Sequence, residues 1–135
     1  MQSKQVLTLE EVRKIASAAE AEAQAHNWAV TISIVDDGGN LLWLQRLDGA
    51  APISAHIAPS KARTAALGRR ETKVYEDMIN NGRLSFITAP KLEGMLEGGV
   101  PIMAGGQCIG AVGVSGVKSS EDVQIAKAGI AALNV

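Results

Sequence analysis

Cationic, hydroxyl and glycine residues spread along this chain have the chemistry needed to bind a small carboxylate. Gly98-Gly99 and the turn near Gly116 could present backbone N–H groups to an anion. The side chains that could add countercharge or a hydrogen bond are Arg46, Lys61, Arg63, Thr64 and Ser115. Glu97 could then act as a general base, with Lys61 as a second catalytic candidate. These residues predict a binding protein or an enzyme for a small carboxylate or hydroxy acid.

The same residues also have a structural interpretation. Gly110, Gly113 and Gly116 lie in or at the end of a predicted strand, where missing side chains indicate that a chain segment, a subunit or a ligand approaches the backbone closely. Arg46 could form a structural ion pair with Asp48. Both interpretations stay open at this point.

Composition limits the classes of function. Thirteen basic and fourteen acidic residues leave a net charge of -1, which argues against nucleic acid or an anionic membrane as a partner. We see no signal peptide and no apolar run long enough to span a bilayer, and therefore expect a cytoplasmic protein. The length suits one domain, residues 1–135. The lone cysteine, Cys108, excludes an internal disulfide.

Two β-hairpins are predicted from alternating apolar residues and turn residues. Val30–Val35 and Leu41–Leu47 flank a turn at Asp36–Asn40, and Val100–Ala104 and Cys108–Val114 flank Gly105-Gly106-Gln107. Asp36 and Asp37 suit turn chemistry rather than a metal loop, because further acidic ligands are missing at the required spacing. No metal site is predicted.

Helices are expected before, between and after the hairpins. Thr8 and Glu11 form a capping box for a helix over 9–26. A second helix either starts near Pro52 and kinks at Pro59, or starts at Pro59, and ends at Gly68. A third covers 73–80, and Ser119 or Ser120 caps the last. Residues 83–99 suggest a loop with at most one short strand. The order α-β-β-α-α-β-β-α indicates an α+β fold with an antiparallel sheet.

Five segments resemble the GlcG/HbpS-like family in their order and spacing. This family includes the carboxy-terminal domain of PduO-type cobalamin adenosyltransferases. The segments are Val35–Gly39, Gln45–Ala50, Lys61–Ala66, Glu97–Ile102 and Ile109–Gly116, and the similarity extends over nearly the whole chain. The resemblance implies a profilin-like α-β-α sandwich with about five strands that assembles as a homo-oligomer. Family members often accompany glycolate, glycerol or diol metabolism, and some bind haem.

Haem binding would be noncovalent, because the chain has no c-type attachment motif. Of the histidines, His56 is the preferred axial candidate and His26 the second. Other axial candidates are Cys108, Met95 and Met103, and candidate propionate partners are Lys61, Arg63 and Arg69. The family commonly has histidine after the Asp-x-Gly-Gly turn, whereas this chain has Asn40. Asparagine cannot replace imidazole as a strong iron ligand or as a base.

Three functions are therefore expected as alternatives. The first is a small-molecule or haem-binding accessory protein of glycolate, glycerol or diol metabolism. The second is an enzyme acting on a small carboxylate or hydroxy acid. The third is a non-catalytic assembly partner of a metabolic enzyme. Haem binding predicts a coloured complex, an enzyme predicts dependence on Glu97 or Lys61, and an assembly partner predicts a stable complex.

Overall fold

The computed structural model describes residues 1–135 and contains four α-helices, one 3-10 helix and four strands. In chain order they are α1 (Leu9–Ala25), β1 (Thr31–Asp36), β2 (Leu41–Arg46), α2 (Ser54–Gly68), α3 (Thr72–Asn80), η1 (Leu84–Thr88), β3 (Gly99–Ala104), β4 (Gln107–Ser115) and α4 (Ser119–Ala131). No helix has both the length and the hydropathy required to cross a bilayer.

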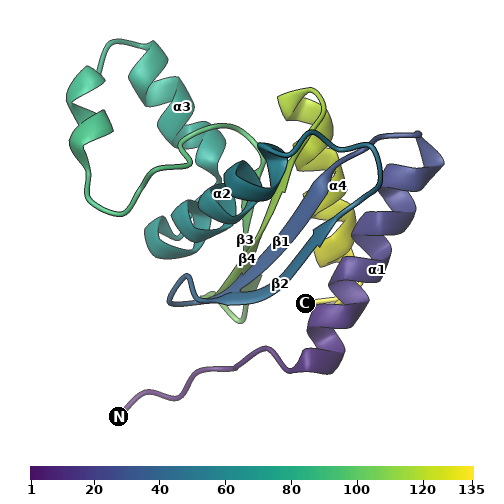
Figure 1. The fold of residues 1–135 in the computed structure, drawn as a ribbon. Helices are drawn as coiled ribbons and strands as arrows, with labels where there is room; N and C mark the ends of the chain where they lie inside the picture. Colours follow the sequence, from purple (N-terminus) through teal and green to yellow (C-terminus); the bar gives the residue numbers. More distant parts are fainter.

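The strands form one antiparallel sheet in the order β2-β1-β4-β3. Figure 1 shows α1 and α4 on one face of this sheet and α2 on the other, with α3 extending beyond α2. The predicted α+β sandwich is confirmed. The expected number of about five strands is wrong, because the structure has four. Residues 84–88 form η1, and the segment from Ala89 to Gly98 reaches β3 without pairing as a strand.

The two faces of the sheet are packed differently. Toward α1 and α4, side chains such as Ile32, Ile34 and Val112 join the larger apolar cluster. Toward α2, the contacts are small: Val35 and Ala111 meet three alanines of that helix. A Cβ added at Gly113 would lie 2.1 Å from the Ala58 carbonyl oxygen. The helix α2 therefore lies close to the sheet, and its side chains reach the strands and the loops around them.

The observed helix boundaries agree in part with those predicted from the sequence. Thr8 is the N-cap of α1 as predicted, since its hydroxyl accepts from the Glu11 N–H at 3.4 Å. The capping box is only half formed, because the Glu11 carboxylate accepts from the Thr8 hydroxyl at 2.7 Å rather than from the Thr8 N–H. The helix α2 begins at Ser54, so a start at Pro59 is wrong. The cap of α4 is Lys118 rather than either serine, because the Glu121 carboxylate accepts the Lys118 N–H and fixes the helix start there.

Candidate functional site

A buried ion pair between Lys61 and Asp122 joins α2 to α4. The Lys61 ammonium donates to Asp122 Oδ2 at 3.2 Å and to the Val114 carbonyl of β4 at 3.0 Å. The two side chains are 4% and 3% exposed. The ammonium is therefore held between two helices and a strand, with acceptors provided by the chain itself.

The Asp122 carboxyl is perturbed by this burial. Desolvation raises its pKa from 3.8 to about 6, although the Lys61 charge and the Val117 N–H both act to lower it. The cost of removing the carboxylate from water is thus larger than its gain from pairing. Asp122 is consequently a carboxyl that changes charge just below neutral pH.

Glycine and threonine residues surround this ion pair. A Cβ on Gly98 would lie 2.6 Å from Lys61 Nζ, and one on Gly99 would lie 2.4 Å from the Lys61 carbonyl oxygen. Thr72 accepts the Gly99 N–H at 2.9 Å, and Thr64 accepts the Gly94 N–H at 3.1 Å. The structure thus brings together four of the predicted site residues. Their polar groups bond to other groups of the chain, namely Val114, Asp122, Thr72 and Gly94, which favours the packing explanation for these glycines.

The other predicted binding residues make no hydrogen bond to Lys61, although Ser115 directly follows Val114, whose carbonyl accepts from the Lys61 ammonium. Ser115 is buried opposite Thr31 of β1, and Gly116 packs against Ala29 and Val30. Arg63 lies within α2, two residues after Lys61, and its side chain would meet a Cβ on Gly39 of the β1–β2 turn. Arg46 ends β2 and forms no ion pair with Asp48.

Glu97, the candidate base, is half-buried beside α3. Its N–H donates to the Glu76 carboxylate at 3.4 Å. Lys73 has a raised pKa, chiefly because Asp77 accepts its hydrogen bond, and the charge of Glu97 adds to this effect. The carboxylate of Glu97 therefore interacts electrostatically with Lys73, an exposed lysine of α3.

The two candidate axial histidines are both exposed. The His26 ring stacks on Trp28 with centroids 4.2 Å apart, and its Nε2 lies 3.3 Å from the Glu22 carboxylate. His56 lies in the first turns of α2, and its ring makes no hydrogen bond within the chain. Neither histidine lines a hollow of the surface.

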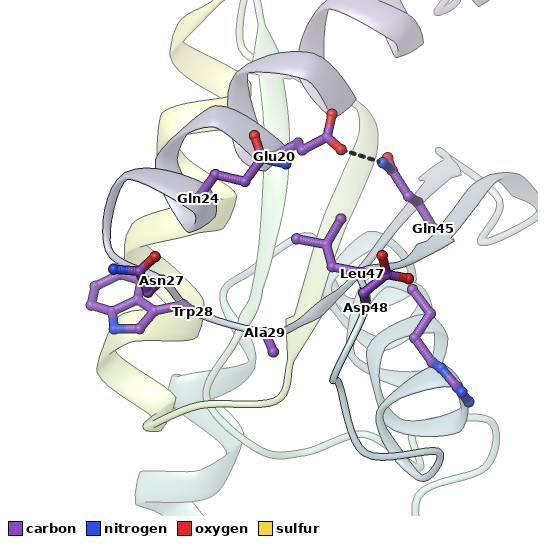
Figure 2. A pocket seen from close by; sticks show the side chains of 9 residues that line it. Glu20, Gln24, Asn27, Trp28, Ala29, Gln45, Leu47 and Asp48 are labelled. Atoms are coloured by element: carbon purple, nitrogen blue, oxygen red, sulfur yellow. Dashed lines mark hydrogen bonds between the residues drawn. The ribbon is translucent and has the colours of Figure 1, made fainter.

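The hollow drawn in Figure 2 lies between the end of α1 and the segment that follows β2. It encloses about 530 Å³. Its polar wall is ordered by a chain of hydrogen bonds: Trp43 Nε1 donates to Gln45, and the Gln45 amide donates to Glu20. Arg46 also borders it, but side chains alternate along a strand, so Arg46 and Gln45 point to opposite faces of the sheet. The hollow's wall is therefore amide and carboxylate rather than cationic.

A second hollow, of about 350 Å³, lies beside the β3–β4 hairpin and contains sulfur donors. Met103 and Cys108 are directly opposite in the two strands, so both side chains lie on the same face. Lys4 and Arg69 are the cations of this hollow, and both bond to Asp37. Lys4 and, more weakly, Arg69 lower the pKa of the Asp37 carboxyl. We call this the sulfur hollow.

Comparison with known proteins identifies the chain's relatives. The family model described as "Haem degrading protein HbpS-like" matches residues 7–131. The chain belongs to the HbpS-like family. Within this family it is 57% identical to protein GlcG of Escherichia coli K12 over 115 residues, which cover 85% of each chain.

Solved structures of HbpS-like proteins share the fold. A double mutant of HbpS from Streptomyces reticuli superposes with a TM-score of 0.89 at 33% identity, covering 98% of this chain and 90% of that one. A structure described as a PduOC:heme complex gives a TM-score of 0.85 at 30% identity, covering 97% of both chains. The second of these proteins was therefore crystallised with haem.

The sulfur hollow is lined by two residues whose sulfur atoms could ligate haem iron, Met103 and Cys108. Thiol and thioether sulfurs are both used as axial ligands of haem iron. The volume lies in the usual range for ligand pockets, roughly 300–1,000 Å³. Two cations stand near, as carboxylate partners require. No group of three or more His, Cys, Asp or Glu side chains is placed to hold a separate metal ion.

Sequence reasoning missed Asp122 and Thr72 as partners of the predicted residues. Asp122 was expected only as an acidic residue of a first helical turn, because nothing local to it indicates a lysine 61 positions earlier. Thr72 could be recognised in the sequence as the residue that opens a helix. Its hydrogen bond with Gly99 could not, because Gly99 lies 27 positions further along the chain and the two residues come together only when β3 is placed beside α3.

Proposed function

We propose that this protein is a haem-binding accessory protein that holds haem noncovalently at the sulfur hollow. The observation that carries the proposal is the cross-strand pair of Met103 and Cys108 beside two cations. A relative at 30% identity, whose structure is described as a haem complex, supports it. The proposed assembly is a homo-oligomer, as the family resemblance implies, and the proposed location is the cytoplasm.

Each residue of the sulfur hollow has a separate role in the proposal. Cys108 Sγ is the preferred axial donor, with Met103 as its alternative. Arg69 and Lys4 neutralise propionates, and they do so by leaving or sharing their present acceptor, Asp37. Bound haem would supply redox and ligand-binding chemistry. The chain's residues orient it and leave part of it open to solvent, because the hollow is shallow and polar.

His56 and His26 remain axial candidates under this proposal. The free ring of His56 stands on the exposed side of α2, near Ile53, which is 59% exposed. His26 would first have to leave Glu22 and Trp28. For this reason we rank both below the sulfur pair.

A haemin titration followed in the Soret band tests the proposal. The variants are Cys108→Ser, Met103→Leu, His56→Ala and His26→Ala, each compared with the unmodified chain. We expect saturation near one haem per chain, weakened or spectrally shifted by Cys108→Ser and unaffected by His26→Ala. A featureless, nonsaturating spectrum would refute haem binding, and a loss confined to His56→Ala would move the site to α2.

Catalysis on a small carboxylate has less support from the geometry. The Lys61 ammonium already donates to Val114 and Asp122 in a buried position, and Glu97 lies beside α3. We keep small carboxylates for a thermal-shift screen, although the Gly99 N–H is already bonded to Thr72 and Gly98 packs against Lys61. The link to glycolate, glycerol or diol metabolism, and a metabolic enzyme as partner, stay predictions that affinity purification would test.

A further inference from the structure

The two edges of the sheet differ in how they are protected. At one edge, β3 carries Pro101, which has no N–H to offer, and its first residue, Gly99, is bonded to Thr72 of α3. At the other edge, β2 has no proline. Its side chains include Leu44, which is 47% exposed. The bulge at Leu42 and the charge of Arg46 protect the two ends of β2, and the backbone groups around Leu44 are the part of this edge that can pair with another chain.

The hydrogen bonds to β1 determine which backbone groups of β2 are free. The Leu47 N–H donates to the Val30 carbonyl at 2.9 Å, so residue 47 faces β1. Bonding alternates along an antiparallel ladder, and therefore Gln45 and Trp43 also face β1 while Leu44 and Arg46 face outward. The register shift between Ile34 and Val35 confines this regular stretch to Trp43–Leu47.

The outward-facing backbone N–H and carbonyl groups of β2 can pair with the same groups on a second copy of β2. Two antiparallel strands related by a two-fold axis bond only where outward residues meet outward residues, so the axis passes through a residue rather than between two. An axis at Gln45 would place the two Arg46 side chains as diagonal neighbours. An axis at Leu44 instead places Leu44 against its own copy and keeps the arginines apart. Because Arg46 then meets Leu42, where the register shift lies, the regular pairing extends only over Trp43–Gln45.

We propose that two copies of this chain pair through β2, antiparallel, about a two-fold axis at Leu44. The N–H of Leu44 then donates to the carbonyl of the partner's Leu44, and the reverse bond forms as well. The two four-stranded sheets join into one sheet of eight strands. The inference rests on the proposed homo-oligomer and specifies its interface, and it is independent of haem.

The pairing also completes the hollow of Figure 2. Gln45, Arg46, Leu47 and Asp48 border that hollow. In an antiparallel pair centred on Leu44, the end of one β2 lies beside the start of the other. The partner's turn before Leu41 therefore adds a wall at Leu47 and Asp48, where a single chain leaves the hollow open.

Cysteine cross-linking tests the axis directly. In a Cys108→Ser background, Leu44→Cys places two thiols directly opposite across the axis, where Cα atoms are about 5.5 Å apart and a disulfide can form. Gln45→Cys is the matched control. Rapid covalent dimerisation of Leu44→Cys, much faster than that of Gln45→Cys, is the expected result. A faster reaction at Gln45→Cys would overturn the axis at Leu44.

Light scattering and sedimentation of the unmodified chain and two lysine variants test the interface as a whole. Leu44→Lys puts two ammonium groups at the axis and is expected to weaken association roughly thirty-fold or more. Leu84→Lys, at a leucine of η1 that is 64% exposed, is the control and should leave association unchanged. An oligomer that survives Leu44→Lys overturns the interface alone. A chain that is monomeric without any substitution overturns the proposed assembly too.

Discussion

At the residue scale, the interior is organised around one charged group. Lys61 sits among Gly98, Gly99 and Val114, and its ammonium is neutralised by Asp122. Burying both charges costs free energy that their mutual attraction only partly offsets, as the raised pKa of Asp122 indicates. The pair therefore fixes where α2, β4 and α4 meet more than it adds stability.

Lys61→Met should destabilise the fold strongly near neutral pH. The substitution leaves the Asp122 carboxylate buried without its cation, which typically costs about 3–5 kcal/mol. The double variant Lys61→Met with Asp122→Asn should regain most of this loss. Urea unfolding followed by tryptophan fluorescence measures both. Equal losses in the single and double variants would contradict a pair whose charges compensate each other. The exposed pair Lys73 and Asp77 is the control, where the same cycle should change little.

The pH dependence of stability should carry the signature of Asp122. The folded chain holds this proton more tightly than the unfolded chain, because the pKa rises from 3.8 to about 6. Its contribution is thus fully present below pH 3.8 and is lost as pH rises to about 6, amounting to at most about 3 kcal/mol. Relative to Asp122→Asn, the unmodified chain should lose stability across this window in urea unfolding. A difference that stays flat or grows with pH would refute the raised pKa.

At the element scale, glycines determine how closely the layers approach. The strand β4 meets the backbone of α2 at Gly113, that of β1 at Gly110 and the segment before β1 at Gly116. The expected close approach to this strand is thus confirmed, and its partners are chain segments of the same molecule.

Gly113→Ala should be among the most damaging small substitutions. The added Cβ would lie 2.1 Å from the Ala58 carbonyl oxygen and 2.5 Å from the Ala62 nitrogen, so α2 must move. Overpacking of this kind costs about 1–3 kcal/mol or more. Thermal denaturation provides the measurement. Gly106→Asn, at a hairpin position with φ +78° and open space, should change the melting temperature little. A similar melting temperature for both variants would argue against a tight helix–sheet contact.

The helices and strands were largely predictable from local sequence, whereas the contacts between them were not. Glycine-rich turns define both hairpins, and Thr8 with Glu11 defines the start of α1, because these signals act over a few residues. The residue patterns indicated four strands, as observed, and the expectation of about five came from the family resemblance and was wrong. Asp122 opposite Lys61, and Cys108 opposite Met103 within a hollow, depend on tertiary packing. Sequence patterns consequently predicted which residues could belong to the candidate site, but not where in the fold these residues come together.

At the scale of the whole molecule, the sheet separates two surfaces. The edge strand β2 lies at one side, and the sulfur hollow borders β3 and β4 at the other, with β1 between them in the strand order. Assembly through β2 leaves the β3–β4 side of the sulfur hollow uncovered, while its other side, at Asp37 of the β1–β2 turn, lies near the proposed contact.

Leu44→Lys should accordingly separate assembly from ligand binding. We expect this variant to be monomeric in sedimentation while taking up haem with the same stoichiometry per chain in a haemin titration. Loss of haem together with the oligomer would contradict this separation, because it would locate the ligand between copies.

The most direct test of the proposed haem site is electron paramagnetic resonance of the ferric haem complex, since its g values report the axial ligand. We predict that Cys108→Ser changes the spectrum of the unmodified chain while His26→Ala preserves it. A spectrum unchanged by Cys108→Ser would contradict a cysteine ligand, and a spectrum unchanged by both Cys108→Ser and Met103→Leu would remove the sulfur hollow as the site.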